Sequence, residues 1–365
     1  MSPALVGWLA CSATLLAACT DSTALASLTP LPAVEPGPIM QMVRSALTRD
    51  EQRLIDFRRD LHRHPELSGE EVRTAQRVAD ELRRLGLEVR TGVGGHGVVG
   101  LLRGARPGPL IAYRADMDAV PSSAKDPVAF ASLTAGVRHI CGHDIHTTVG
   151  VALAAALREV RDSLAGSVMF VFQPAEERAT GAQAMLSDAV FAPIVPAAIY
   201  GLHTAPLEVG LLATTAGPMM AGRDRFSVVL SGPGDLAGAM ASVRQRIATL
   251  STMDASQITV SQPPDFIYVQ MGAPQPSGAQ LRLDGTVTVA SAASRARVQA
   301  TIESGIAAEL PSGVSVSSTY EARQIAGVTN DSGLTTLAMA AVREALGASS
   351  LLRLITIPPA FSEDF

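Results

Sequence analysis

Short apolar runs alternate with helical stretches over the first 220 residues of this 365-residue chain. The apolar runs cover residues 97–102, 110–115, 167–172 and 197–201, whereas residues 41–61, 68–85, 145–160 and 181–186 carry apolar side chains at helical spacing. Strands that alternate with helices are typical of an α/β fold. We therefore expect a first domain with a mostly parallel sheet flanked by helices.

The helix expected at 68–85 begins with the residues of a capping box. Ser68 precedes Glu71 by three residues, the spacing at which the two side chains bind backbone amides of the first turn. Gly86 follows the last apolar position, as is typical of a helix C-terminus. The sequence therefore predicts a helix that starts at Ser68 and ends at Leu85.

The pattern changes near residue 221. Residues 225–230 and 279–289 alternate like half-exposed strands, while 236–250 and 293–310 are helical in pattern. A helix at 332–346 and an apolar strand at 351–357 then return to the first pattern. We predict a main domain over 38–220 and 328–365, into which a small α+β domain, 221–327, is inserted.

Cys141 and His143 stand two residues apart, directly before the helix expected at 145–160. Thiolate and imidazole are standard ligands of zinc-like ions. Gly142, between them, lets the backbone bend tightly enough for both to reach one ion. Such a pair is rarely a packing feature, and we predict that both residues ligate metal.

Glu176 and Glu177 follow the strand expected at 167–172. Adjacent carboxylates repel each other unless they share a cation or a proton. In a metal site one can ligate while the other takes a proton from water. A glutamate pair alone is usually a solvated helix start, but the Cys141–His143 pair in the same chain favours the functional interpretation.

Two further polar clusters follow expected strands. His203 comes after 197–201, and Asp116 and Asp118 come after 110–115. Open α/β sheets place their sites at the carboxyl ends of strands. Because four clusters occupy such positions, we expect their side chains to form one site.

Charge excludes one class of partner. The net charge is −5, and no run of basic residues forms a patch that could bind a nucleic acid. Hydrophobic content of 47% and charged content of 17% indicate a packed globular protein.

The first 19 residues predict a bacterial lipoprotein signal. An apolar stretch, too short to span a bilayer, ends in Leu16-Ala17-Ala18-Cys19, with a polar tether over 20–37. We expect a lipid on Cys19 as the sole link to the membrane, placing the protein in the cell envelope, on the periplasmic side of the outer membrane in a Gram-negative host. The alternative is an alanine-rich helix with an incidental cysteine.

Seven segments together resemble the M20 metallopeptidase family, and more narrowly its amidohydrolase and carboxypeptidase branch, which includes hippurate hydrolases and auxin-conjugate hydrolases. They are DFRRDLHRHPELSGE (56–70), RADMDAVP (114–121), HICGHDIHTT (139–148), FQPAEE (172–177), GLHTAP (201–206), AGPMM (216–220) and FSEDF (361–365). The resemblance implies a catalytic α/β domain with two divalent metal ions (zinc, manganese or cobalt) and an inserted α+β lid domain that often forms homodimers. The implied reaction is hydrolysis of the amide bond in an N-acyl amino acid or a small peptide.

The resemblance also implies roles for individual residues. The metal ligands are Cys141, as the bridging ligand, His143, Glu177 and His203. Glu176 matches the general base, and Asp118 matches the acid that orients a ligand. Asp116 is a less central participant, and we expect Asp144 and His146 to support the ligands from behind.

The chain departs from the family in three places. It ends at Phe365, before the family's last histidine ligand, so we expect a C-terminal truncation. Residues 231–236 lack the Gly-Gly-His of the lid, whose histidine stabilises the oxyanion, and the strand at 285–288 lacks its arginine. These departures leave three interpretations open: an active amidohydrolase, a homologue that binds metal or an amino-acid conjugate without efficient turnover, and a truncated product that does not fold stably.

Overall fold

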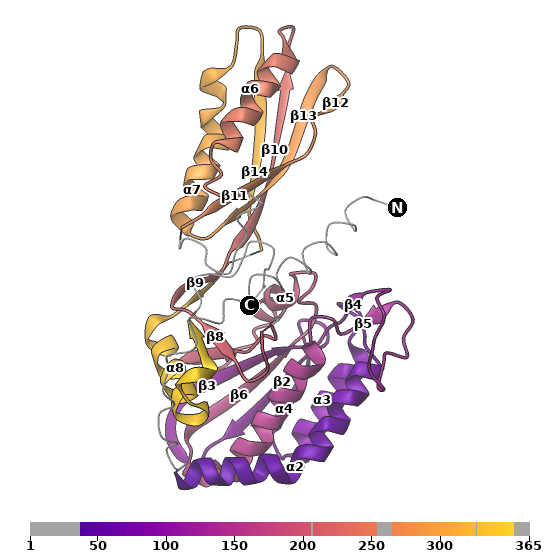
Figure 1. The fold of residues 1–365 in the computed structure, drawn as a ribbon, viewed down its shortest axis with the longest axis vertical. Coiled ribbons are helices and arrows are strands. Elements are labelled where there is room, and N and C mark those ends of the chain that lie inside the picture. Colours follow the sequence, from indigo (N-terminus) through magenta and orange to yellow (C-terminus); the bar gives the residue numbers. More distant parts are fainter. Residues whose placement is uncertain (1–36, 206, 254–264, 326, 354–365) are drawn as a thin grey trace. The chain divides into compact units, whose positions relative to one another are not determined.

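The computed structural model describes residues 37–205, 207–253, 265–325 and 327–353 (Figure 1). They fall into two compact units, Glu35–Glu208 and Val209–Glu363, as far as each is described. The expected lipoprotein signal, nearly all of the tether and the chain end after residue 353 lie outside the described residues. Among the described residues, no helix is both long and apolar enough to cross a membrane.

The first unit contains a five-stranded sheet with the order β1-β2-β6-β3-β7. Its strands are β1 (Glu88–Val93), β2 (Gly97–Arg103), β3 (Arg106–Asp116), β6 (Ala165–Gln173) and β7 (Ala198–Gly201). β3 pairs in parallel with both β6 and β7, whereas β2 pairs antiparallel with β1 and β6. The α/β class is therefore confirmed, and the described sheet is mixed because a β1–β2 hairpin extends its parallel part.

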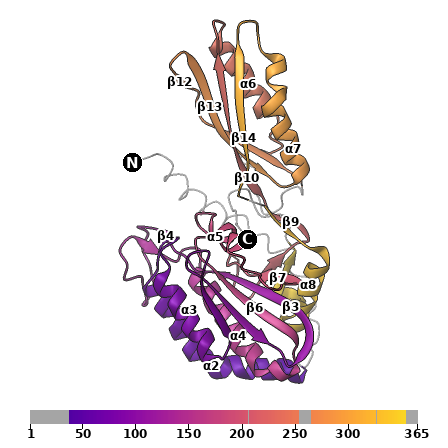
Figure 2. The same ribbon diagram turned by 180° about the vertical axis from the view of Figure 1, so that it is seen from behind.

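Side chains of the sheet alternate between two apolar layers. Val98, Leu102 and Phe170 pack on the side of α2 (Pro38–Arg63), α3 (Val72–Arg84) and α4 (His143–Glu159). Their neighbours along the strands, such as Val99 and Met169, pack on the other side with α5 (Gly181–Ser187). Strand side chains point to opposite faces in turn, so a sheet covered on both faces needs continuous apolar runs. Figure 2 shows these layers from behind.

The expected capping box at the start of α3 is wrong. The helix begins at Val72, its N-cap residue is Glu71, and no side chain caps it from that position. Ser68 donates a hydrogen bond to Asp118 instead (2.6 Å), and Glu71 accepts the backbone amide of Ala175 (2.8 Å). Tertiary contacts have therefore taken the side chains that a local motif would use. Gly86, with φ of +79°, does follow the helix as predicted.

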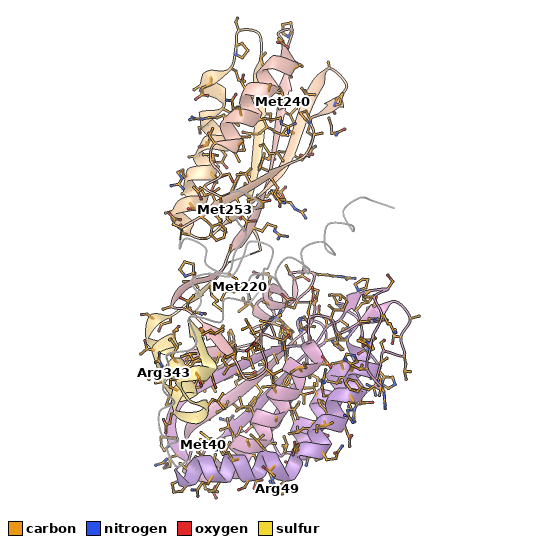
Figure 3. The ribbon with its side chains drawn as sticks, in the orientation of Figure 1. Met40, Arg49, Met220, Met240, Met253 and Arg343 are labelled. Atoms are coloured by element: carbon orange, nitrogen blue, oxygen red, sulfur yellow. The ribbon has the colours of Figure 1, made fainter. Side chains whose placement is uncertain are left out.

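The second unit contains an antiparallel sheet with the order β11-β13-β10-β14, and β12 pairs with β13. Its elements are β10 (Gly222–Ser231), α6 (Leu236–Ala248), β11 (Ile267–Met271), β12 (Gln275–Ser277), β13 (Gln280–Val289), α7 (Ala292–Ala300) and β14 (Ser315–Ile325). One face of the sheet packs against α6 and α7. Met240, labelled on α6 in Figure 3, is 1% exposed in that core. The helix expected at 293–310 continues after α7 as a π turn and a 3₁₀ turn.

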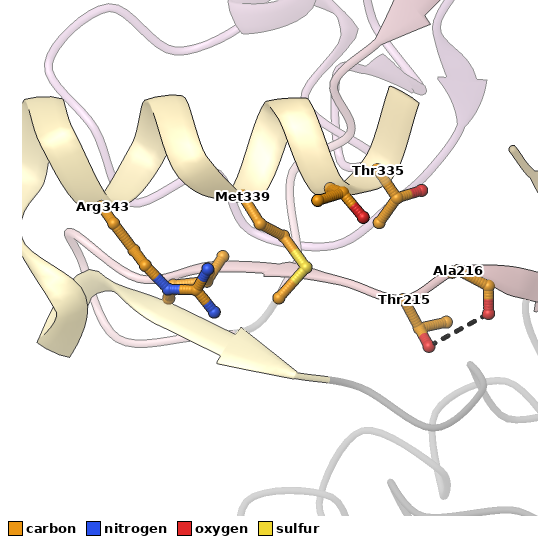
Figure 4. Close-up of a pocket in the computed structure, with 7 residues that line it drawn as sticks. Thr215, Ala216, Thr335, Met339 and Arg343 are labelled. Carbon is orange, nitrogen blue, oxygen red and sulfur yellow. Dashed lines mark hydrogen bonds between the residues drawn. The ribbon is translucent and has the colours of Figure 1, made fainter. Parts of the chain in front are cut away.

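The remaining elements are short except for one helix. They are β4 (Val120–Pro121), which pairs with β5 (Val137–Arg138); β9 (Gly217–Met220), which pairs with β15 (Val328–Asn330); and β8 (Leu212–Thr214), which pairs in parallel with β16 (Leu351–Arg353). Helix α8 (Ser332–Leu346) has the predicted bounds. Figure 4 shows Met339 and Arg343 pointing from α8 into a cavity of about 330 Å³, which Thr215 and Leu351 also line. The insertion of 221–327 into one larger domain stays a prediction.

Candidate metal centre

Three neighbouring strands bring the polar clusters to one edge of the first sheet. In the order β6-β3-β7 all three strands are parallel, and Asp116, Gln173 and Gly201 are their last residues. Asp116 lies opposite Gln173 in the register, and Arg114 lies opposite Gly201. The segments that follow these strands therefore start side by side, as the positions of the clusters predicted.

A tight turn places Cys141 and His143 at the same edge, immediately before α4. Gly142 has a φ of +83°, a conformation that favours glycine. A Cβ atom there would lie 2.5 Å from Oγ1 of Thr204. The Thr204 hydroxyl donates to the carbonyl of Cys141 (2.7 Å), so the turn packs directly against the segment that carries His203.

His143 is the common member of three groups of possible metal ligands. Within each group the ligand atoms lie within 4.8 Å of one another. The groups are Cys141, His143 and Glu177; Asp118, His143 and Glu176; and Asp116, His143, His146 and His203. The structure therefore brings together the four expected ligands and the two expected catalytic residues, which are Cys141, His143, Glu177, His203, Glu176 and Asp118. Their individual roles stay predictions.

The His143 ring is oriented for ligation. Its Nδ1 lies 3.0 Å from Oδ1 of Asp118, which sets Nδ1 as the donor, so Nε2 carries the lone pair once the ring has lost its other proton. Nε2 is buried and has no hydrogen-bond partner among the described residues. It lies 3.7 Å from Oε1 of Glu177, 3.8 Å from Oδ2 of Asp116 and 3.9 Å from Oε2 of Glu176. A buried lone pair that faces three carboxylates fits a cation between them.

Buried charges perturb the titration of these groups. Burial opposes protonation of His143, but the carboxylates of Asp116 and Asp118 raise its pKa to about 9. Burial, together with the neighbouring Glu177, raises the pKa of the Cys141 thiol far above its usual value. Burial also raises the pKa of Glu177. His143 and the Cys141 thiol therefore retain protons that a bound cation would displace.

Asp116 and His146 belong to the cluster more directly than the sequence indicated. Nδ1 of His146 contacts Oδ1 of Asp116, and the amide of Thr204 donates to Nε2 of His146 (2.8 Å). The His146 ring centroid lies 4.5 Å from that of His203. Burial raises the pKa of Asp116, but Arg114 and His143 outweigh it and hold that pKa well below its usual value. In the sequence, the one indication of this role was that Asp116 lies in the RADMD segment and His146 in the HDIH segment.

Asp118 connects three parts of the site. Besides contacting His143, its Oδ2 accepts the hydroxyl of Ser68 (2.6 Å) and the backbone amide of Glu177 (2.9 Å). Its exposed fraction is 1%, yet hydrogen bonds from His143 and Ser68 lower its pKa against the effect of burial. An ionised, fully bonded carboxylate fixes both the imidazole and the glutamate turn.

Asp144, the neighbour of His143, makes contacts of a different kind. Its Oδ2 accepts Nε of Arg58 (3.0 Å) and lies 2.9 Å from Nδ1 of His62. These contacts tie the first turn of α4 to α2. Asp144 is absent from the three ligand groups, in keeping with the supporting position expected for it.

A family model described as peptidase family M20/M25/M40 matches residues 112–365. N-acetylcysteine deacetylase of Bacillus subtilis is 42% identical over 193 residues, which make up 51% of this chain and 49% of that protein. The chain thus spans about half the length of that relative. A protein of Synechocystis named a probable hydrolase is 36% identical over 332 residues, 86% of this chain and 82% of its own length.

One solved structure extends the likeness to three dimensions. A Bacillus subtilis protein, described as a dinuclear metal binding peptidase from the M20 family, superposes with a TM-score of 0.72 at 31% identity. The superposition covers 87% of this chain and 85% of that one. Its fold therefore matches both units of this chain over most of their length.

Proposed function

Because this chain belongs to peptidase family M20/M25/M40, we propose that it is a metal-dependent hydrolase that cleaves the amide bond of N-acyl amino acids or small peptides. One observation carries the proposal. The buried Nε2 of His143 has no described hydrogen-bond partner and faces the carboxylates of Asp116, Glu176 and Glu177. A lone pair and several carboxylates in so small a volume are the donors that divalent cations require.

The donor set fits two cations. Cys141, His143 and Glu177 form one group, and Asp116, His146 and His203 remain as donors for a second ion, because the lone pair on Nε2 of His143 serves one ion only. Divalent cations held there would polarise a scissile carbonyl and lower the pKa of water. Mixed thiolate, imidazole and carboxylate donors suit zinc, manganese or cobalt.

Glu176 is the proposed general base. Its carboxyl group belongs to the cluster with Asp118 and His143, and the residue is 8% exposed. There it takes a proton from the attacking water and returns it to the leaving nitrogen. Asp118 holds the Nδ1 proton of His143 and the amide of Glu177, so it keeps the base next to the ligands. N-acetylcysteine deacetylase, together with a protein of Saccharolobus solfataricus named thermostable carboxypeptidase 2 that is 38% identical over 200 residues, supports an acylated amino acid or a peptide as substrate.

Replacing each glutamate by glutamine separates the two roles. Glu176→Gln should retain bound metal and lose turnover of N-acetyl amino acids, because the proton acceptor is gone. Glu177→Gln should lose metal as well. Bound metal is measured by mass spectrometry of the purified proteins, and turnover by release of the free amine. If both variants keep full metal, or both keep activity, the assignment is wrong.

A homologue that binds without efficient turnover is the second candidate. The observation that favours it lies in the second unit, where β10 leads into the turn at 231–235. Asp235 caps α6 there by accepting the amides of Ala237 (3.1 Å) and Gly238 (3.0 Å). The turn therefore supplies a helix cap where an oxyanion-binding imidazole was expected, and losing one such donor costs on the order of a hundredfold in rate.

Binding and turnover measured side by side decide between the two candidates. The purified protein is loaded with manganese, zinc or cobalt and mixed with a panel of N-acetyl amino acids. Heat released on binding, with no free amine produced over hours, would establish the binding function and exclude the proposed hydrolase.

A further inference from the structure

One segment of the chain lies against the centre without contributing a ligand. It runs from residue 66 to 71, between α2 and α3, and consists of the last five residues of the DFRRDLHRHPELSGE segment (56–70) followed by Glu71. Two of its side chains face the site. Ser68 donates to Asp118 (2.6 Å), and Glu71 accepts the backbone amide of Ala175 (2.8 Å). Residues 66–71 therefore contact both the segment that carries Asp118 and the segment that carries Glu176 and Glu177.

Glu71 is a fully buried carboxylate, with an exposed fraction of 0%. Its Oε1 accepts two backbone amides, those of Gly69 (2.7 Å) and Ala175 (2.8 Å). Its Oε2 is buried without a partner in the part of the chain that the structure describes. A buried carboxylate is costly unless it serves polar groups that have no other partner, and here it serves two amides.

The backbone that Glu71 holds is strained. Ala175 has a φ of +52°, in the left-handed region that alanine rarely adopts. Its carbonyl then accepts the amides of Thr180 (3.3 Å) and Gly181 (3.2 Å), which close the turn around Glu176. Such a conformation persists only where the surroundings fix it.

Two buried carboxylates hold the amides on either side of Glu176. The amide before it, of Ala175, donates to Glu71, and the amide after it, of Glu177, donates to Asp118. The contact with Asp118 fixes the peptide plane between Glu176 and Glu177, and the contact with Glu71 fixes the plane between Pro174 and Ala175, one residue before the proposed base. Asp118 also contacts His143, whereas the hydrogen bonds described for Glu71 go to the backbone amides of Gly69 and Ala175.

We propose that Glu71 is a positioning residue that fixes the backbone at Glu176 for proton transfer, by accepting the amide of Ala175. The proposal rests on the role of Glu176 given above. An acceptor at this point keeps Ala175 in its left-handed conformation and so sets the direction in which the base leaves the main chain. A shift of the base by about 1 Å would slow the reaction by up to about a hundredfold.

Three variants test the proposal in the metal-loaded full-length protein. Glu71→Gln keeps an acceptor for both amides, and Glu71→Met keeps the length of the side chain but removes the acceptor. Glu66→Met is the matched control, because the Glu66 carboxylate also accepts two amides, those of Arg73 (3.0 Å) and Thr74 (2.7 Å), at the start of α3.

The first measurement is hydrogen–deuterium exchange of a peptide that covers residues 174–181, which needs no turnover. Glu71→Met should speed exchange there about tenfold, the factor that one buried hydrogen bond represents. Glu71→Gln and Glu66→Met should leave it unchanged. The second is steady-state hydrolysis, in which Glu71→Met should lower kcat tenfold to a hundredfold at unchanged KM and metal content.

Unchanged exchange at 174–181 in Glu71→Met overturns the proposal, whether or not the protein turns over substrate. An equal loss of kcat in Glu71→Met and Glu66→Met also overturns it, because the effect would then be one of stability. A wild-type protein without turnover would remove the proposed hydrolase function, while the exchange measurement would still decide what Glu71 holds.

Discussion

Gly142→Ala is the substitution for which the structure gives the sharpest expectation. An alanine with φ of +83° costs roughly 1–2 kcal/mol of conformational free energy. The new Cβ would also lie 2.5 Å from Oγ1 of Thr204, so Thr204 has to move. Thr204 holds the carbonyl of Cys141 and Nε2 of His146, and losing a buried hydrogen bond costs about 1–3 kcal/mol. We therefore expect Gly142→Ala to lower the free energy of unfolding by about 2–5 kcal/mol in total.

The matched control is Gly136→Ala. Gly136 has a similar φ of +72°, but a Cβ atom there meets nothing within 4 Å. In Gly136→Ala the free energy of unfolding should fall only by the conformational cost, roughly 1–2 kcal/mol. Stability is measured by urea unfolding, and metal affinity by competition with a chromogenic chelator.

Metal binding is the more telling readout of the two. Gly142→Ala displaces the turn that carries Cys141 and His143, so it should bind metal at least tenfold more weakly than wild type. Gly136→Ala should bind metal as wild type does. Equal metal affinity in the two variants would refute the reasoning, because the contact with Thr204 would then be without consequence for the ligands.

Three further predictions concern other parts of the chain. A cation must displace protons from His143, whose pKa is raised to about 9, and from Cys141. The apparent affinity for metal should therefore rise by about tenfold per displaced proton for each pH unit between 6 and 8. Metal affinity that does not change with pH in a chelator competition would contradict this. Tyr320→Phe removes a donor to the buried Asp224 (2.6 Å) and should lower the free energy of unfolding by about 1.5–3 kcal/mol in urea, and an unchanged value would count against that bond. Cys19→Ser should abolish labelling with palmitate, whereas a wild-type protein that takes up no label would show that the N-terminus is not a lipoprotein signal.

The strands of five or more residues that sequence analysis missed share a position in the fold. β1, β11 and β14 lie at the edges of their sheets. Edge strands expose more of their side chains, so polar residues interrupt the apolar pattern, as in EVRTGV of β1. The inner strands β3, β6, β10 and β13 were predicted from their apolar patterns, which are continuous runs within β3 and β6 and largely alternating in β10 and β13. Helix α8 was predicted with its bounds because helical periodicity is local.

The location of the site was predictable from the sequence, but the grouping of its side chains was not. Polar clusters after apolar runs indicated one shared site, and the parallel strands β6, β3 and β7 do end at one edge. The grouping around His143 was not predictable, because it depends on the order of strands in the sheet. The capping box failed for the same reason, since Ser68 and Glu71 bind residues that are distant in sequence.

The buried carboxylates of the first unit should make the stability of the protein depend on metal. Glu71, Asp116, Asp118 and Glu176 are each at most 8% exposed, and all lie in one compact unit. Negative groups crowded together out of water repel one another, and divalent cations offset that repulsion. Ions that bind only the folded chain stabilise it by an amount that grows with the logarithm of their concentration. The working lifetime of the protein should therefore follow the trace-metal content of its surroundings.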